Sequence, residues 1–217
     1  MRIVKPSFHI EEVDGMELLK KIEKAGRTCY KSEDRITDDS ALTFVKTICK
    51  SGHESVLEHE KVTVRIICDR GVSHEIVRHR IAAYSQESTR YCNYSNSKFG
   101  NEITVIEPLF FKDNPERYEL WKTAMEQAEA TYFSLLKIGA SPQESRSVLP
   151  NSLKTEIVVT YNLREWKHFF KLRTSPAAHP QMREIACPLL RAFQARIPIV
   201  FDDINLYHVD EKSEHDK

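Results

Sequence analysis

Apolar residues recur at helical spacing in several stretches of the chain. Leu18, Leu19 and Ile22 mark one such face within residues 16–30, because residues three and four apart lie on the same side of a helix. Further helices are predicted at residues 38–50, 72–80, 114–138, 142–148, 163–173 and 180–196. The positions interpreted as core in two of these helices are Leu120, Trp121, Met125, Ala128, Phe133, Leu163, Trp166, Phe169, Phe170 and Leu172.

Two other stretches have the pattern of strands. Residues 61–68 alternate between apolar and polar side chains, and residues 153–161 are rich in Val, Ile and Thr. Because two strands do not make a stable sheet alone, shorter strands are expected near residues 2–8 and 89–95.

The predicted fold class is α+β, with a mixed or antiparallel β-sheet flanked by several helices. The chain has 217 residues, which suits a single domain, and this domain is expected to span residues 1–209. The charged segment DEKSEHDK at residues 210–217 is expected to be a disordered tail.

Composition narrows the class of protein. The 32 Lys and Arg residues balance 32 Asp and Glu residues, which does not favour general binding to nucleic acid, since that affinity comes from neutralising many phosphates. The five cysteines are an odd number without a CxxC pair, so neither a disulfide framework nor a zinc ribbon is expected. The N-terminal residues lack an apolar leader and no run of about 18 apolar residues occurs, so we expect a cytoplasmic protein without a membrane span.

Residues 75–94, with the sequence EIVRHRIAAYSQESTRYCNY, combine arginines with short hydroxyl side chains. Arg78, His79 and Arg80 are consecutive, and Arg90 follows ten residues later. Arginine offers a planar fork of donors, and short side chains let backbone N–H groups approach an anion. The segment therefore predicts an anion or nucleotide site, while a solvated charged turn, or cations that stabilise a helix C-terminus, would give the same pattern.

The segment GHESVLEH at residues 52–59 contains two His and two Glu, which raises the question of a metal. His53 and His59 are six residues apart, and the histidines of HEIVRH at residues 74–79 are five apart. Helical ligand pairs need spacings of three or four, so no metal site is predicted. For Glu58 and His59, a helix cap or a buried hydrogen-bonded pair is the simpler interpretation.

Two later segments contain further candidates. PQESRSVLP places Arg146 in a short helix, where a surface Glu/Arg pair is the default interpretation. In NLREWKHFFKLR, Asn162 follows a predicted strand and is expected to cap the next helix. Arg173 stands at the end of that helix, where its side chain can enter a cleft.

Together these motifs resemble those of the flavin-dependent thymidylate synthase family. The family signature is Arg-His-Arg, seven residues, Ser and then Arg-Tyr, and this chain has it at residues 78–80, Ser88 and residues 90–91. GHESVLEH, PQESRSVLP, NLREWKHFFKLR and HPQMREIA stand in the family's order, so the resemblance covers roughly residues 1–207.

The chain departs from a stricter form of the motif. It has Ala83, Ser85 and Gln86 where that form has Ser, Asn and Glu, and it has Glu75 where Gln is common. Gln86 preserves hydrogen bonding but lacks the negative charge, so only a role that needs the charge is in doubt.

The resemblance implies residues for two ligands. Those for FAD are Ser55, Arg78, His79, Arg80, Gln86, Asn162, Leu163, Arg164 and His168. Those for dUMP are Glu75, Ile76, Val77, Arg78, Gln86, Glu87, Ser88, Thr89, Arg90, Arg146 and Arg173. His53 and Tyr91 are candidates for the folate or flavin face, with simple ring packing as the alternative for Tyr91.

Arg173 is the expected catalytic residue. Uracil C5 becomes nucleophilic as negative charge develops on N3, O2 and O4, and a fixed guanidinium stabilises that charge. A covalent mechanism is not expected, because Cys68 lies in a predicted strand and Cys187 on an apolar helix face. Cys92, near the motif, is the exception to watch, and Ser88 is expected to bind substrate rather than attack it.

The implied reaction is the reductive methylation of dUMP to dTMP. The expected one-carbon donor is 5,10-methylenetetrahydrofolate, NADPH-reduced FAD is the hydride source, and tetrahydrofolate leaves. The family resemblance also implies a homotetramer in which neighbouring subunits build each site. The alternatives are a flavin reductase that ignores dUMP and a non-catalytic nucleotide-binding or RNA-binding module.

Overall fold

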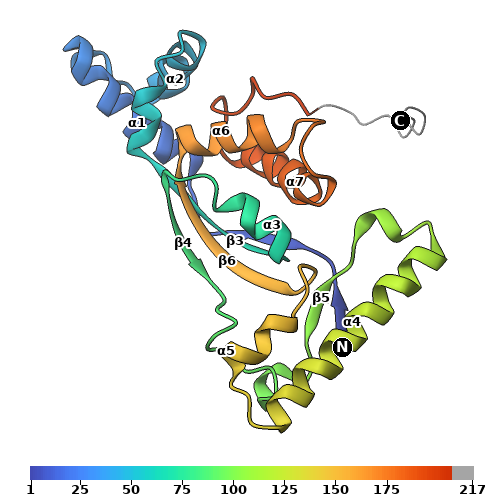
Figure 1. Ribbon diagram of the computed structural model, residues 1–217. Helices are drawn as coiled ribbons and strands as arrows, with labels where there is room; N and C mark the ends of the chain where they lie inside the picture. The colour runs from blue at the N-terminus through green and yellow to red at the C-terminus, as the bar shows by residue number, and fades with distance from the viewer. Residues whose placement is uncertain (207–217) are drawn as a thin grey trace. The chain divides into compact units, whose positions relative to one another are not determined.

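The computed structural model describes residues 1–206, and their contacts divide the chain into two compact units (Figure 1). Unit 1 comprises Met1–His9, Val64–Arg80 and Tyr84–Val159, and unit 2 comprises Ile10–Thr63, Ile81–Ala83 and the residues from Thr160 onward. The predicted tail at residues 210–217 lies outside the described residues. The single domain at residues 1–209 and the homotetramer stay predictions.

The strands confirm a mixed α+β arrangement. They are β1 (Arg2–Val4), β2 (Ser7–Ile10), β3 (Lys61–Asp69), β4 (Ala82–Gln86), β5 (Thr104–Ile106) and β6 (Lys154–Asn162). β1 and β5 pair in parallel, with Ile3 opposite Val105, and Val105 also forms an antiparallel bridge with Leu153. The other strands form a sheet of order β2-β3-β6-β4.

The two long strands are confirmed as β3 and β6. Val62, Val64 and Ile66 of β3 are all buried, as an alternating strand with one covered face requires. The strand expected at residues 89–95 is wrong, because residues 88–92 form a turn. The neighbour of β6 is β4 instead, a short strand whose polar Ser and Gln residues give a weak strand signal.

The helices agree closely with the predicted ones. They are α1 (Gly15–Tyr30), α2 (Ser40–Lys50), α3 (Arg70–Ile76), α4 (Pro115–Lys137), α5 (Pro142–Ser145), α6 (Leu163–Arg173) and α7 (Pro180–Arg196), with 3-10 turns η1 (Glu33–Arg35), η2 (Glu54–His59), η3 (Ser97–Phe99), η4 (Leu109–Phe111) and η5 (Arg146–Val148). Asp14, Asn114 and Asn162 each accept a backbone N–H from the first turn of their helix, which is why these ends were predictable. The helix expected at 72–80 is wrong at its end, since α3 stops at Ile76.

The core of unit 2 is aromatic. Trp166, Phe169 and Phe170 of α6 are fully buried, and Trp166 and Phe170 pack against Phe193 of α7, beside which α6 lies (Figure 1). The Trp166 indole N–H donates to Val62 O at 3.0 Å, so the ring is fixed as well as buried. Leu172, also predicted as core, is 47% exposed, because it lies about 200° around the helix from Phe170.

The core of unit 1 lies between α4 and the β1–β5 pair. Trp121 and Met125 are buried there as predicted, and Tyr132 joins them. Leu120 is 68% exposed and was wrongly predicted as core, because it stands about 100° around the helix from Trp121. Tyr132, which the prediction omitted, stands seven residues after Met125 and continues the same face of the helix.

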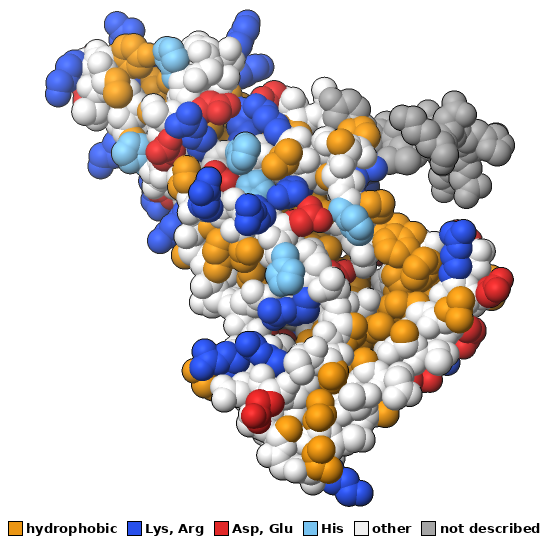
Figure 2. Space-filling view, viewed as in Figure 1, with side chains coloured by type: hydrophobic (Ala, Val, Ile, Leu, Met, Phe, Trp, Pro, Cys, Tyr) orange, Lys and Arg blue, Asp and Glu red, His pale blue; other side chains and the backbone are white. Residues whose placement is uncertain are grey.

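Among the described helices, none is long and apolar enough to cross a membrane. On the face of the molecule drawn in Figure 2, Lys and Arg side chains are interspersed with Asp and Glu side chains. This mixture matches the balanced charge of the sequence.

Candidate functional site

The Arg-His-Arg motif lies on a turn that follows α3. Arg78 N donates to Glu75 O at 3.2 Å and His79 N donates to Ile76 O at 3.1 Å. The Tyr84 hydroxyl, from β4, lies 2.8 Å from Ile76 O and 2.5 Å from His79 O, and donates to these carbonyls. The His79 side chain is therefore buried on a fixed turn, while the arginines on either side are exposed.

The end of β4 is held by Gln86, a side chain that the family resemblance assigns to both ligands. Gln86 Nε2 donates to Ser73 Oγ at 3.0 Å and to Thr155 Oγ1 at 3.2 Å. These bonds fix β4 against α3 and β6 within unit 1. Gln86 thus has a structural role in this chain, and its contacts to FAD and dUMP stay predictions.

The Glu87 carboxylate is also engaged within the chain. It accepts from Lys154 Nζ at 2.8 Å and from the Tyr94 hydroxyl at 3.1 Å. Burial, together with the nearby Glu87 carboxylate, raises the pKa of the Tyr94 phenol, so the phenol keeps the proton that it donates. The predicted contact of Glu87 with dUMP stays a prediction.

Ser88 opens the turn that carries the end of the motif. Its carbonyl accepts the N–H groups of Tyr91 and Cys92 at 3.1 and 2.9 Å, and its hydroxyl accepts Arg90 N–H at 3.3 Å. Arg90 is exposed, with its guanidinium 5.4 Å from the centre of the Tyr91 ring. Tyr91 is 78% exposed, so the simple ring-packing interpretation is wrong for the single chain.

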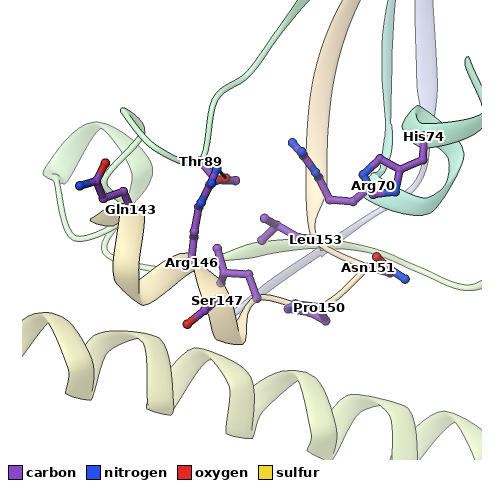
Figure 3. A pocket seen from close by; sticks show the side chains of 10 residues that line it. Arg70, His74, Thr89, Gln143, Arg146, Ser147, Pro150, Asn151 and Leu153 are labelled. Carbon is purple, nitrogen blue, oxygen red and sulfur yellow. Dashed lines mark hydrogen bonds between the residues drawn. The ribbon is translucent and has the colours of Figure 1, made fainter. Parts of the chain in front are cut away.

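A cavity of about 460 Å³ opens next to this turn in unit 1. Its lining residues are Arg70, His74, Thr89, Gln143, Arg146, Ser147, Leu149, Pro150, Asn151 and Leu153. Arg146 Nη1 donates to Thr89 Oγ1 at 3.3 Å, and Figure 3 shows Arg146 reaching toward Thr89 from η5. The lining side chains are cationic, titratable or neutral, and none of these described residues is a carboxylate, so the cavity favours an anion.

Arg70 and His74 are two of the lining residues that the sequence analysis did not assign to a site. Arg70 and His74 lie one turn apart on α3 and approach the cavity from the same side (Figure 3). Asp69 caps this helix by accepting Val72 N–H at 2.7 Å, which sets the direction in which Arg70 leaves the chain. An Arg-x-x-x-His pair at the start of a helix was the available signal, since residues i and i+4 share a face.

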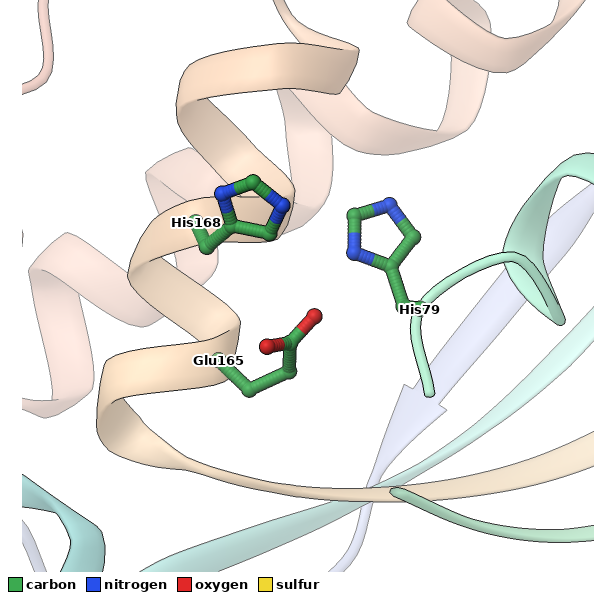
Figure 4. A group of neighbouring side chains, drawn as sticks. All are labelled: His79, Glu165 and His168. Atoms are coloured by element: carbon green, nitrogen blue, oxygen red, sulfur yellow. The ribbon is translucent and has the colours of Figure 1, made fainter. Parts of the chain in front are cut away.

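A second cavity, of about 470 Å³, lies in unit 2 beside η2 and the start of α6. Its lining residues are Glu54, Glu58, Ile81, Asn162, Arg164, Glu165, Lys167, His168 and Lys171. Asn162 Oδ1 accepts Glu165 N–H at 2.8 Å and so begins α6 as predicted. Figure 4 draws Glu165 and His168 one turn apart on this helix.

Within unit 2 the structure brings together three of the residues assigned to FAD: Asn162, Arg164 and His168 line this cavity. Arg164 forms an ion pair with Glu58. Glu58 is 46% exposed, so the interpretation of Glu58 and His59 as a buried hydrogen-bonded pair is wrong.

The other unit 2 candidates lie away from the lining. Leu163 is fully buried and its N–H donates to Glu60 O at 2.9 Å. Ser55 and His53 are exposed on and before η2, and His53 Nδ1 lies 3.3 Å from the Tyr30 hydroxyl. Arg173 is the last residue of α6 and is half-buried. Their roles toward a ligand stay predictions, as does the absence of a metal.

The cysteines give no support to a thiol nucleophile. Burial raises the pKa of the Cys68 thiol to about 12, and burial also raises the pKa of Cys187. Both thiols therefore stay protonated at neutral pH, and a thiolate is the reactive form. Cys92 is half-buried behind the Ser88 turn.

Comparisons with known proteins extend over most of the chain. A family model described as thymidylate synthase complementing protein matches residues 13–199. The chain is 39% identical over 166 residues to the flavin-dependent thymidylate synthase of Pyrococcus abyssi, covering 76% of this chain and 67% of that protein. It is 33% identical over 213 residues to the enzyme of that name from Corynebacterium glutamicum, covering 90% and 82%.

A solved structure shares the fold. The UMP/dUMP methylase PolB from Streptomyces cacaoi, bound with 5-Br dUMP, superposes with a TM-score of 0.76 over 93% of this chain and 95% of that one, at 21% identity. The family match spans both units and both candidate cavities, and the sequence identity extends over most of the chain. The chain therefore belongs to the flavin-dependent thymidylate synthase family.

Proposed function

We propose that this protein is a flavin-dependent thymidylate synthase that converts dUMP to dTMP. The observation that carries the proposal is the contact between Arg146 and Thr89 in the unit 1 cavity. These residues are 57 positions apart, and the family resemblance assigns both of them to dUMP. Their convergence on one cavity without carboxylates is what a nucleotide phosphate requires.

The unit 1 cavity suits the phosphate end of dUMP. A phosphate monoester carries a charge of about −1.5 to −2 at pH 7, and the guanidinium groups of Arg146 and Arg70 offer forked donors to it. The Thr89 and Ser147 hydroxyls add neutral donors. Ser88, whose hydroxyl already accepts a backbone N–H, is positioned to bind rather than to attack.

The unit 2 cavity suits part of a flavin nucleotide. Asn162, Arg164 and His168 would hold the cofactor there, with Ser55 on the neighbouring η2 turn. A guanidinium and an imidazole are donors that the flavin carbonyl oxygens accept from, whereas Glu54, Glu58 and Glu165 in the same lining disfavour a pyrophosphate there. Cavities of about 300–1,000 Å³ are typical of ligand sites. When bound, FAD supplies the hydride, after reduction by NADPH, and 5,10-methylenetetrahydrofolate supplies the carbon.

Arg173 is the proposed catalytic residue. It ends α6, the helix that contains Arg164 and His168, so one rigid element carries both flavin ligands and the group that stabilises charge on uracil. The guanidinium remains protonated, so it acts by stabilising negative charge on the ring oxygens and N3 and not by removing a proton.

The proposed assembly is a homotetramer in which neighbouring subunits complete each site. Ile81 is 65% exposed and Tyr91 78% exposed, and both belong to the signature segment. Exposed apolar and aromatic side chains of this kind are typical of surfaces that another subunit covers. The proposed location is the cytoplasm, with no nucleic acid or membrane as partner.

The deciding assay measures tritium release from 5-tritiated dUMP with NADPH and methylenetetrahydrofolate. Release coupled to dTMP formation supports the synthase. NADPH oxidation that continues without tritium release identifies a flavin reductase instead. A colourless protein that binds dUMP without turnover identifies a non-catalytic nucleotide-binding module.

A further inference from the structure

Lys167 is a charged residue inside the aromatic core of unit 2. Its side chain is 1% exposed, although it stands between Trp166 and the buried Phe169 on α6. Lysine is almost never fully buried unless it is paired. Its Nζ lies 3.0 Å from Glu54 Oε1 and 3.2 Å from Asp203 Oδ2. One ammonium therefore connects α6 to η2 and to the segment after α7.

Lys171 provides a natural comparison. It lies one turn further along α6, and its Nζ is 4.0 Å from Glu54 Oε1 and 3.6 Å from Asp203 Oδ2. Its side chain is 51% exposed, so the longer contacts are screened by water and contribute little. The two lysines therefore touch the same carboxylates, but only Lys167 does so out of solvent.

The buried ammonium is charged, and its contacts with the two carboxylates are ion pairs that lack hydrogen-bond geometry. Burial alone lowers the pKa of Lys167, but its contact with Glu54 and the charge of Asp203 outweigh burial and raise the pKa. A buried ion pair of this kind is not an efficient source of stability, because well-packed apolar residues of similar volume often stabilise a core as well or better. Its use is to fix one arrangement of the segments that it joins.

The arrangement that Lys167 fixes is the wall of the unit 2 cavity. Glu54 and Lys167 both line this cavity, together with Arg164 and His168. Glu54 is the first residue of η2 and directly precedes Ser55. The ion pair between Glu54 and Lys167 therefore joins the η2 wall to the α6 wall, as the more exposed pair between Glu58 and Arg164 also does.

We propose that Lys167 is a positioning residue for the flavin site. Its buried ammonium pairs with Glu54 and so holds η2 at the distance from α6 that the cofactor requires. This inference rests on the proposed function, since it takes the unit 2 cavity as the flavin site. Lys167 itself does not need to touch the cofactor. Its effect passes through Glu54 to the backbone of η2.

The test is Lys167→Met in the full chain, with Lys46→Met, an exposed lysine on α2 outside the cavity lining, as the control. Methionine has similar length and fills the buried space without a charge. We expect the dissociation constant for FAD, measured by flavin fluorescence, to rise at least tenfold in Lys167→Met. The melting temperature of the FAD-free protein should stay within a few degrees of the wild type, and Lys46→Met should change FAD affinity less than twofold.

Glu54→Gln gives a second variant and a double-mutant cycle. If the two residues act through their ion pair, the Lys167→Met and Glu54→Gln effects on FAD affinity should be strongly non-additive. At saturating FAD, tritium release by each variant should return to within about threefold of the wild type, because a positioning residue is not part of the chemistry. A Lys167→Met protein that fails to fold leaves Glu54→Gln to decide, with the same expected loss of affinity.

Unchanged FAD affinity in both variants, or additive effects in the cycle, would overturn the proposal. A drop in melting temperature that fully accounts for weaker FAD binding would also overturn it, since the role would then be structural. Failure of the proposed function has a different signature, because the wild type itself would then show no dUMP-dependent tritium release.

Discussion

Replacing Arg146 by Met tests whether the unit 1 cavity binds the phosphate of dUMP. The guanidinium is exposed at the cavity, and its one described hydrogen bond is the 3.3 Å contact with Thr89 Oγ1. A single long contact between an exposed guanidinium and a hydroxyl contributes at most about 1 kcal/mol to folding, since solvent screens the charge. The substitution should therefore leave the fold nearly as stable as before.

The effect on dUMP should be much larger than the effect on folding. A hydrogen bond to a charged group is worth about 1.5–3 kcal/mol, and exposure of Arg146 to solvent reduces this because salt screens the charge. A loss of about 1.4–2.7 kcal/mol corresponds to a tenfold to hundredfold rise in the dUMP dissociation constant. The affinity of the wild type should also fall with added salt more steeply than that of the variant.

Titration calorimetry with dUMP and with 2′-deoxyuridine provides the measurement. Only dUMP carries the phosphate, so Arg146→Met should weaken dUMP and leave deoxyuridine unchanged. Arg117→Met, an exposed arginine on α4 outside the cavity lining, is the matched control. Equal weakening of both ligands, or less than twofold weakening of dUMP, would refute the assignment of the cavity to the phosphate.

Three further predictions concern catalysis and stability. Arg173→Ala should abolish tritium release while the flavin absorbance of the purified protein is retained, and near-normal turnover would remove Arg173 from its catalytic role. Gly15→Ala should destabilise unit 2 by several kcal/mol, because an added Cβ would lie 2.0 Å from the backbone oxygen of Arg196. Denaturant unfolding measures this loss, and a change in the free energy of unfolding of less than about 0.5 kcal/mol would contradict the packing. The pKa of Cys68 is raised from 9.0 to about 12, so the unfolded state loses its thiol proton first and stability should fall as pH rises above about 9. The free energy of unfolding should therefore differ less between pH 8 and pH 10 in Cys68→Ala than in the wild type.

Local patterns predicted most of the elements, because their signals lie within a few residues. The N-caps Asp14, Asn114 and Asn162 fixed three helix starts, and each accepts the expected backbone N–H. Apolar periodicity identified the buried face of α6 through Trp166, and it failed only for isolated residues such as Leu172 that lie off that face. Position in a helix is a local property, so the sequence determines it well.

The walls of the cavities were harder to predict, because they depend on contacts between distant segments. The resemblance pointed to Thr89 and Arg146, but it gave no reason to add Arg70 to the same wall. Arg70 reaches the cavity because its backbone N–H is anchored to Asn151 O at 2.9 Å. That bond joins segments some 80 residues apart, and no local pattern contains it.

Gln86 explains how this chain tolerates its departure from the stricter motif. A glutamine donates from its amide to the hydroxyls of Ser73 and Thr155, at 3.0 and 3.2 Å. A glutamate in the same place has no hydrogen to donate, so both hydroxyls would have to donate to it, and the Ser73 hydroxyl would lose its bond to Arg70 O at 2.9 Å. The contacts around β4 in this chain therefore use the neutral amide as the donor. A catalytic role for negative charge at residue 86, in contrast, would need a carboxylate there. Activity of this chain, which has Gln86, would show that another residue fills that role.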